Sequence, residues 1–463
     1  MRASKKLAEL SDVVLLKEVL ARAGLGPGAF AVPVALAVAV GLFEAASVWL
    51  LVALARGMVG MDFAFARELP VLRTLFQVLP RAFVERAAAP FIVLVAGVFL
   101  AFLMKNLMQY GSATGIAPLV LRFGNSMRKL LLERYLSFGK LYFDRPSAGY
   151  LHSVLMSFTD KVAGKLADLQ QFFSCFFTLL AYFGMMCFIS WRLTLLCALI
   201  FPVMNRVQVW LIQKIRASSA SSVDAQADMS RKLFNVLACL PLVKTYATER
   251  QERESFAKSS DEVERCEFSM DKKLLLILPA QEILVLALLL LLISAMALLV
   301  SRQGSALLPG FLVFFYVIRR AAASFGVMSH MKASLASISG PITEVLSLLD
   351  DADKHFVADG NEPFPGLRSR IEFVDLSYSY DQDKPVLRGV SFTVEKGKMT
   401  AIVGPSGAGK STIASLLARF YDCPRGSILI DGRDISEFTN ATLRAHLAMV
   451  SQDALLLNDT LRS

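Results

Sequence analysis

The stretch Gly404-Pro405-Ser406-Gly407-Ala408-Gly409-Lys410-Ser411 matches the phosphate-binding pattern G-x-x-x-x-G-K-[ST] at every fixed position. A β-forming run, Thr400 to Val403, precedes it, and the pattern predicts a helix from Lys410 to Phe420. Glycines at these positions let the backbone curl so that successive amides face a phosphate, and the helix start adds its dipole. The stretch therefore predicts an α/β nucleotide-binding domain.

The side chains at the end of this loop predict the chemistry of the bound group. Lys410 places a positive charge against the β- and γ-phosphate oxygens, and the hydroxyl of Ser411 is a ligand for Mg²⁺. Thr412 completes the predicted nucleotide-contacting segment, which runs from Gly404. The expected cofactors are ATP and Mg²⁺.

The surrounding sequence fits a partial α/β domain from residue 371 to residue 463. Short β-forming runs alternate with the predicted helix, as in other nucleotide-binding domains. These runs are Ile371–Tyr378, Val390–Val394, Met399–Val403, Ser427–Ile430 and Leu447–Val450. An acidic segment rich in Pro and Gly lies before them, so we predict a linker over residues 347–370.

Residues 30–346 have a different character, because long apolar runs dominate them. A helix needs about 20 mostly apolar residues to cross a bilayer. Six runs meet that expectation: Phe30–Ala55, Ala88–Met108, Leu169–Ile189, Leu193–Ile212, Leu274–Val300 and Leu307–Ile318. The fold class expected is a polytopic α-helical membrane domain of six transmembrane helices, followed by the partial P-loop domain.

Loop charge predicts the orientation of these spans. Lys and Arg are abundant between spans two and three and between spans four and five, which places both stretches in the cytoplasm with the nucleotide-binding domain. The loop from Arg56 to Arg86 is also Arg-rich and departs from this rule. Each cytoplasmic stretch has helical periodicity, so the spans are expected to extend well beyond the membrane as long cytoplasmic helices. For residues 1–29 we predict an amphipathic helix lying on the cytoplasmic face of the membrane.

Composition excludes several other functions. The 463 residues are 55% hydrophobic and 19% charged, with a net charge of +10. No basic run is interleaved with stacking aromatics, so nucleic acid is not an expected partner. The six cysteines include no C-x-x-C pair and the four histidines lie far apart, so neither predicts a metal or redox site.

The chain resembles the ABC transporters, specifically the exporter-type half-transporters with six spans and a C-terminal nucleotide-binding domain. The resemblance rests on the phosphate loop together with Tyr378–Tyr380, Pro385–Phe392, Gly426–Gly432 and Val450–Asp453. It implies that Tyr380 stacks on adenine, and that Gln452 is the glutamine that touches Mg²⁺ or the attacking water. Phe143–Gly149 with Asp160, and Leu240–Tyr246 with Glu249, look like its coupling regions. The implied partner is a second half-transporter, most simply a second copy, in the cytoplasmic (inner) membrane.

Family motifs that follow Gln452 are not seen before Ser463. These are an LSGGQ-type signature, a Walker B strand and a switch histidine. The resemblance then implies weak or no nucleotide binding by these 463 residues, and no efficient ATP hydrolysis.

Charged residues inside apolar spans are costly and often functional. Glu44, Lys105 and Glu282 are therefore the candidate substrate residues. Leu42–Ala45, Leu103–Leu107 and Tyr316–Arg320 are similar to a subgroup that flips lipid-linked saccharides. The implied function is ATP-driven export or flipping of a lipid, glycolipid or other amphipathic substrate. A non-catalytic subunit paired with a complete half-transporter, and a siderophore importer of exporter architecture, remain alternatives.

Overall fold

The computed structural model describes residues 12–60, 88–144, 148–198, 201–303, 308–351, 356–380 and 385–450, with Phe63, Phe65, Gln77, Pro80 and Val84 besides. Gln452 and the segment around it lie outside these residues. The chain folds as two compact units. The first comprises residues 1–132 and 149–350, and the second comprises residues 133–148 and 351–463.

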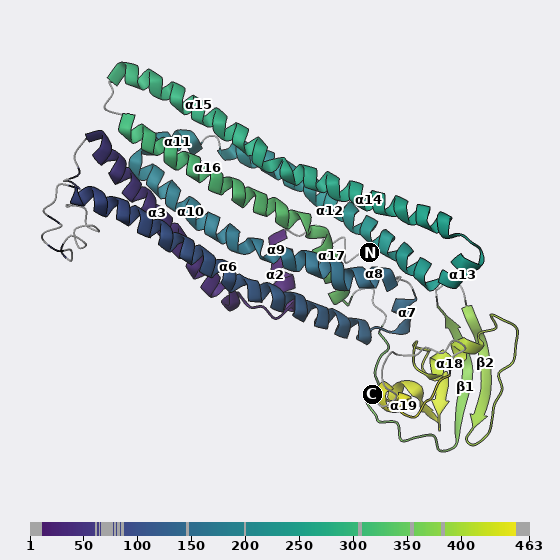
Figure 1. Ribbon diagram of the computed structural model, residues 1–463. Helices are drawn as coiled ribbons and strands as arrows, with labels where there is room; N and C mark the ends of the chain where they lie inside the picture. Colours follow the sequence, from purple (N-terminus) through teal and green to yellow (C-terminus); the bar gives the residue numbers. More distant parts are fainter. Residues whose placement is uncertain are drawn as a thin grey trace. The chain divides into compact units, whose positions relative to one another are not determined.

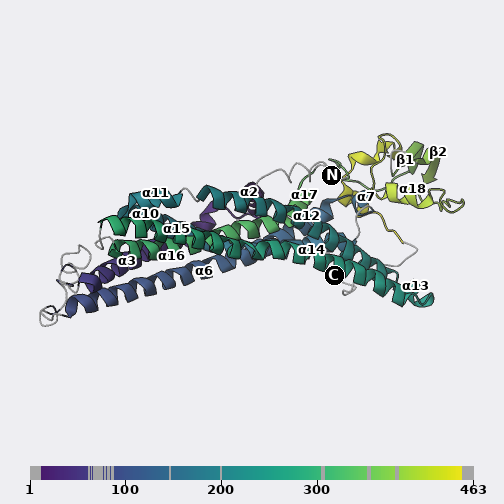
Figure 2. The same ribbon diagram turned by 90° about the horizontal axis from the view of Figure 1, so that it is seen from above.

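Long helices make up the first unit, and they run alongside one another in both views (Figures 1 and 2). The predicted first, second and third spans fall in α3 (Ala31–Gly60), α6 (Ala89–Ser137) and α10 (Asp168–Ile189). The fourth falls in α11 (Trp191–Ala198) and α12 (Phe201–Ala238), and the fifth and sixth in α15 (Ile277–Gln303) and α16 (Leu308–Ser337). Four helical segments of the described residues are long and apolar enough to cross a membrane, and they overlap the predicted spans one, two, three and five.

Several helices continue far beyond the apolar runs, as predicted. The 49 residues of α6 correspond to about 74 Å of helix at 1.5 Å per residue, against about 30 Å of hydrocarbon core. The returning pair α12 and α14 (Glu249–Leu275) is joined by the short helix α13 (Leu240–Thr245). The helices α8 (Ala148–His152) and α9 (Thr159–Leu166), with the π-helical turn η3 (Ser153–Phe158) between them, lead into α10.

Buried apolar side chains hold the membrane helices together. One cluster joins α3, α10, α15 and α16 through residues that include Val48, Met186, Leu292 and Phe314. Close approach is permitted where side chains are small. A Cβ added to Gly149 in α8 would lie 2.4 Å from the carbonyl oxygen of Ser230 in α12.

The N-terminal helix α2 (Asp12–Arg22) is amphipathic, but its apolar face packs against another part of the protein. Leu15 and Val19 are 1% and 0% exposed, and α2 packs against α17 (Ser339–Leu349). Arg22 also donates a 3.2 Å hydrogen bond to the carbonyl of Leu349. These leucine and valine side chains therefore contact protein, whereas the sequence pattern alone led us to expect a membrane surface beneath them.

The second unit contains a four-stranded antiparallel sheet in the order β2-β1-β3-β4. Its strands are β1 (Arg370–Ser379), β2 (Pro385–Glu395), β3 (Ile428–Ile430) and β4 (Arg433–Asp434). The helices α18 (Lys410–Leu417) and α19 (Asn440–Arg444), the turn η5 (Ile435–Glu437) and, from the other segment, α7 (Lys140–Phe143) complete the unit. The core includes Phe373, Leu387, Leu416 and Ile428.

Two predicted strands are absent from the described residues. Thr400–Val403 and Leu447–Val450 have no regular structure there, and Val403 and Val450 are 88% and 97% exposed. A strand forms only where a neighbour supplies hydrogen-bonding partners. The described residues place no such partner beside either segment, so β propensity alone gave the wrong prediction for both.

Candidate functional site

The phosphate loop joins the exposed segment before it to α18. Residues Gly404 to Ala408 are exposed to solvent, and Gly409 occupies the N-cap position of α18. The ammonium of Lys410 donates hydrogen bonds to the carbonyls of Gly404 and Pro405, at 2.9 and 2.8 Å. The lysine therefore lies back over the loop, and the exposed hydroxyl of Ser411 lies on the first turn of the helix.

Glycine is required at two positions of this loop by backbone conformation. Gly407 and Gly409 have φ angles of +83° and +87°, where a Cβ is strained. At Gly409 an added Cβ would also lie 2.6 Å from a methyl carbon of Leu387. The loop can thus bring backbone amides and the positive end of α18 close to an anion, which fits a polyphosphate.

Tyr380 lies close to this helix. Its hydroxyl is 3.0 Å from the hydroxyl of the buried Thr412, and its ring makes edge contacts with Tyr378 and Tyr421, both at 5.1 Å between centroids. The structure therefore connects the predicted adenine-stacking residue with the predicted phosphate-binding helix. Gln452, the predicted Mg²⁺ and water contact, lies outside the described residues.

A second polar cluster of the same unit involves α7. The Lys140 ammonium donates a 2.7 Å hydrogen bond to the hydroxyl of Tyr421, which donates in turn to Asp144 at 2.8 Å. Lys140 and Asp144 also form an ion pair of 3.1 Å. Burial raises the pKa of Tyr421 to about 12, and Asp144 adds to the rise while Lys140 opposes it. Sequence reasoning placed Asp144 in a coupling region but did not identify Tyr421 as its partner.

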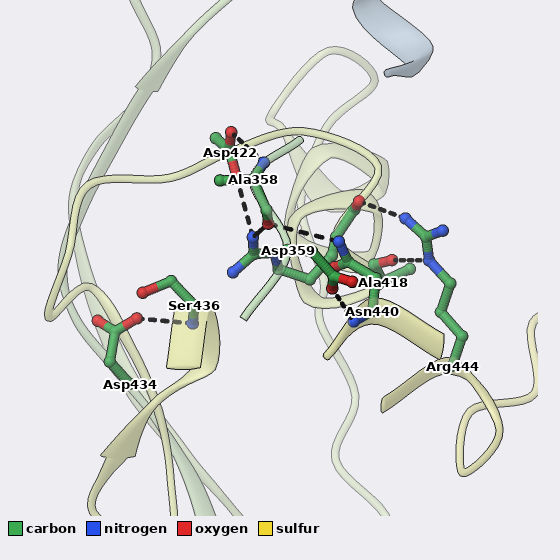
Figure 3. A network of polar contacts seen from close by, with 9 residues as sticks. Ala358, Asp359, Ala418, Asp422, Asp434, Ser436, Asn440 and Arg444 are labelled. Atoms are coloured by element: carbon green, nitrogen blue, oxygen red, sulfur yellow. Dashed lines mark hydrogen bonds and ion pairs between the residues drawn. The ribbon is translucent and has the colours of Figure 1, made fainter. Parts of the chain in front are cut away.

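Polar contacts of the buried Arg419 hold the C-terminal end of α18. Figure 3 shows the neighbouring residues Ala358, Ala418, Asp422 and Arg444. The guanidinium of Arg419 donates to the carbonyl of Ala358 and pairs with Asp422 at 3.2 Å. Arg444 of α19 donates to the carbonyls of Ala418 and Arg419, at 3.2 and 2.7 Å. The linker, the phosphate-loop helix and α19 are therefore tied together, which gives the loop a fixed base.

In the first unit, which contains the predicted membrane spans and is called the membrane unit below, Glu44 lies at the centre of an ion cluster. Its side chain is almost fully buried, with 1% of the residue exposed. One carboxylate oxygen lies 2.7 Å from the ammonium of Lys105, and the other accepts from Arg320 at 2.8 Å and from the hydroxyl of Tyr182. These residues come from α3, α6, α16 and α10, so one carboxylate joins four helices.

The sequence contained a signal for this cluster that our reasoning did not use. A carboxylate inside an apolar helix requires cationic partners, and the spans offer few. Lys105 was singled out separately, and Arg320 stood in a quoted motif, but neither was linked to Glu44. The third candidate, Glu282 of α15, lies elsewhere, at a cavity that Arg319 and Arg320 also line.

The two units together define a class of protein: a helical membrane domain of long extended helices, with a phosphate-loop domain on the same chain. Residues 35–321 match the family described as the ABC transporter transmembrane region, and residues 387–462 match the family described as ABC transporter. The chain therefore belongs to the ABC transporters, with the architecture of an exporter-type half-transporter.

Known relatives agree with this family. The heterocyst differentiation ATP-binding protein HepA of Nostoc sp. is 26% identical over 78% of this chain and 58% of its own length. An ATP-dependent lipid A-core flippase of Aromatoleum aromaticum is 30% identical over 74% of this chain and 57% of its own. A bacterial Atm1-family ABC exporter solved with ATP bound has the same fold, with a TM-score of 0.72 and 23% identity over 92% of this chain and 72% of its own. The chain thus spans less than three fifths of the length of these two curated relatives.

Proposed function

We propose that, in the intact transporter, ATP binding and hydrolysis drive the export or flipping of a lipid, glycolipid or other amphipathic molecule across the cytoplasmic membrane. The observation that carries this proposal is the phosphate loop, with Lys410 and Ser411 on the first turn of α18, in a chain that also holds apolar helices of membrane-spanning length. The names of the flippase relatives support the lipid part of the proposal.

The proposed nucleotide site consists of Gly404 to Thr412 with Tyr380. The loop amides and Lys410 would hold the phosphates, Tyr380 would stack on adenine, and Ser411 and Gln452 would hold Mg²⁺. The ion would neutralise charge on the phosphate oxygens. The fit rests on the left-handed glycines and on the unobstructed hydroxyl of Ser411 at the helix start.

The proposed partner is a second half-transporter, most simply a second copy. Large apolar side chains are exposed around α13, at the turn between two extended helices: Leu237, Leu240, Leu242 and Tyr246. Exposed apolar groups that lie together are typical of contact surfaces. We propose the cytoplasm as the location of this turn and of the nucleotide-binding unit, as the loop charge predicts.

Glu44, Lys105 and Glu282 retain a proposed role toward the substrate, in two different ways. The buried Glu44 would act indirectly, because its oxygens are occupied by Lys105, Arg320 and Tyr182. Glu282 would line the substrate cavity directly.

The test is ATP-dependent lipid transport by the intact transporter in proteoliposomes. Lys410→Ala should abolish transport, because it removes the cation that holds the phosphates. Lys398→Ala is the matched control, since that side chain lies in an exposed turn and pairs with Glu395, three residues earlier in the sequence. Transport that persists in Lys410→Ala would overturn the proposal.

A further inference from the structure

The nucleotide-binding unit, residues 133–148 and 351–463, contains a second cavity besides the nucleotide site. Its volume is about 350 Å³, within the range of about 300–1,000 Å³ typical of ligand sites. The described residues of its wall belong to the segment that leads into α7, to the linker, to the turn after α18 and to α19, and none belongs to the membrane unit. Among them is no residue of the phosphate loop, and neither Tyr380 nor Thr412. The cavity is therefore a separate candidate site.

Aromatic rings form much of the apolar part of this wall. Phe138, Phe143 and Phe420 line the cavity. Phe138 is buried, and its ring lies 4.4 Å from that of Tyr142 and 5.6 Å from that of Phe356, measured between centroids. Aromatic side chains favour other flat rings, which they contact edge-on or in an offset stack. A planar aromatic ligand therefore suits this wall.

The charged groups in the wall are cations. Among the described residues that line the cavity, Lys140 and Arg444 are charged, and no carboxylate is present. The guanidinium of Arg444 lies 5.8 Å from the centroid of the Phe420 ring and forms no ion pair with the described residues. Its hydrogen bonds to two main-chain carbonyls at the end of α18 hold it in place and occupy two of its five N–H groups. The remaining N–H groups can bind an anion.

The other polar groups of the wall also have bonding capacity to spare. The ammonium of Lys140 donates to Tyr421 at 2.7 Å and to Asp144 at 3.1 Å, which occupies two of its three N–H groups. Asp144 compensates this charge, so Arg444 is the cation of the wall without a counter-charge among the described residues. The side-chain oxygen of Asn440 is buried and accepts no hydrogen bond from them either. Buried polar atoms are normally paired, so this wall has the character of a site that lacks its ligand.

We propose that this cavity binds a small aromatic carboxylate, with its ring against the three phenylalanines and its acidic group at Arg444 and Lys140. Such cations bind a carboxylate through charge-assisted hydrogen bonds, and one uncompensated cation matches one negative charge. The ligand would join α7 to α19. It would also adjoin the nucleotide site without entering it, because Lys140 contacts Tyr421, whose ring contacts Tyr380. This inference does not depend on which substrate the transporter carries.

Binding of 2-naphthoate to the chain in detergent, measured by isothermal titration calorimetry against a protein-free detergent blank, tests this proposal. The comparison ligands are 2-naphthylmethanol, which lacks the charge, and decahydro-2-naphthoate, which lacks the aromatic ring. We expect saturable binding of 2-naphthoate and at least tenfold weaker binding of the other two. Equal binding of the alcohol would overturn the role of the cations, and equal binding of the saturated acid would overturn the role of the rings. Tighter binding of 2-naphthyl phosphate would overturn the assignment of a carboxylate.

Matched variants locate the binding site. Arg444→Gln should weaken 2-naphthoate binding about tenfold, the loss expected for a hydrogen bond to a charged group. Arg425→Gln makes the same charge change at an exposed residue of the same unit that does not line the cavity, and it should leave binding unchanged. Ser137→Trp, at an exposed position of the wall, fills the cavity and should abolish binding while the midpoint of thermal unfolding changes little. Undiminished binding by Ser137→Trp would refute the site even if Arg444→Gln failed to fold.

A further comparison distinguishes this cavity from the nucleotide site. Lys410→Ala should bind 2-naphthoate as tightly as the unaltered chain does, because Lys410 does not line the cavity. Excess ATP should not displace 2-naphthoate. Displacement by ATP, or loss of binding in Lys410→Ala, would place the ligand at the phosphate loop and overturn this inference. The readout is binding by the chain itself, so failure of the proposed transport function would leave the result unaffected.

Discussion

The hydroxyl of Tyr421 donates a 2.8 Å hydrogen bond to Asp144, although 277 residues separate the two in the sequence. The same hydroxyl accepts from Lys140 at 2.7 Å, and its ring contacts Tyr380. A short segment from between two membrane spans therefore belongs structurally to the nucleotide-binding unit, where it adjoins the aromatic cluster predicted to contact adenine. Residue spacing in the sequence gives no indication of this arrangement.

Tyr421→Phe tests that contact. We expect the free energy of unfolding of the nucleotide-binding unit to fall by about 1–2 kcal/mol, because the Lys140 ammonium and the Asp144 carboxylate lose a shared partner. Thermal unfolding measures the effect. Tyr246→Phe removes a hydroxyl from a side chain that is 72% exposed and should be neutral. Equal stability of the two variants would show that the contact contributes nothing.

Gly409→Ala tests the geometry of the phosphate loop. The added methyl meets both a strained φ of +87° and a Leu387 methyl carbon at 2.6 Å, so the loop must shift and the helix start must move. We expect the variant to be less stable than the unaltered protein. We also expect it to bind a fluorescent ATP analogue more weakly than the unaltered protein does. Gly397→Ala is the control, because this glycine also has a positive φ, of +77°, but no atom lies within 4 Å of the added carbon. A loss of nucleotide binding as large in the control would point to unfolding instead of loop geometry.

Gly149→Ala tests the close contact between α8 and α12. Its Cβ would lie 2.4 Å from the carbonyl oxygen of Ser230, and backbone atoms cannot yield cheaply. We expect destabilisation of about 1–3 kcal/mol, the range seen when a tightly packed interior is overfilled. Gly164→Ala in α9 meets nothing within 4 Å and should stabilise its helix by up to about 1 kcal/mol. The two substitutions should therefore shift the midpoint of thermal unfolding in opposite directions, as measured by differential scanning fluorimetry.

Glu44→Gln tests the ion cluster of the membrane helices. The variant leaves Lys105 and Arg320 without a counter-charge in the helix interior, so we expect a loss of about 3 kcal/mol. Glu282→Gln removes a carboxylate that is exposed and forms no ion pair among the described residues, so its midpoint should hardly move. If Glu44→Gln unfolds at the same temperature as the unaltered chain, the cluster does not hold these helices together.

Asp434 gives a pH dependence with a defined sign. Burial raises the pKa of its carboxyl, but hydrogen bonds from Ser436 and from the backbone of Gly426 outweigh burial, so the folded-state pKa lies below 3.8. Its contribution to stability is therefore complete above the unfolded pKa and is lost as the pH falls through the folded pKa. Asp434→Asn should be destabilising at pH 7, and the difference from the unaltered chain should shrink below about pH 4. A constant difference across that range would exclude this linkage.

Much of the fold followed from the sequence because its signals are local. These signals are the apolar runs, the basic stretches after them and the glycine pattern from Gly404 to Lys410. Each determines structure within a short segment of the chain, and the structure has helices and a loop at the predicted places. The predictions that were wrong or incomplete have a common physical cause, because each depended on contacts with residues that are distant in sequence. Thr400–Val403 has strand propensity but no ladder partner among the described residues, and Leu15 and Val19 are covered by α17. Glu44 was identified as costly, but its three partners lie on other helices.

The length of α6 has a mechanical consequence. A continuous helix transmits rotation along its axis, and over about 74 Å a tilt of about 5° at one end displaces the other by about 6 Å. Pro118 interrupts the backbone hydrogen bonding of this helical lever, because proline supplies no amide proton to the helix. Bending should therefore concentrate at that residue, and Pro118→Ala would make the lever stiffer without changing its length.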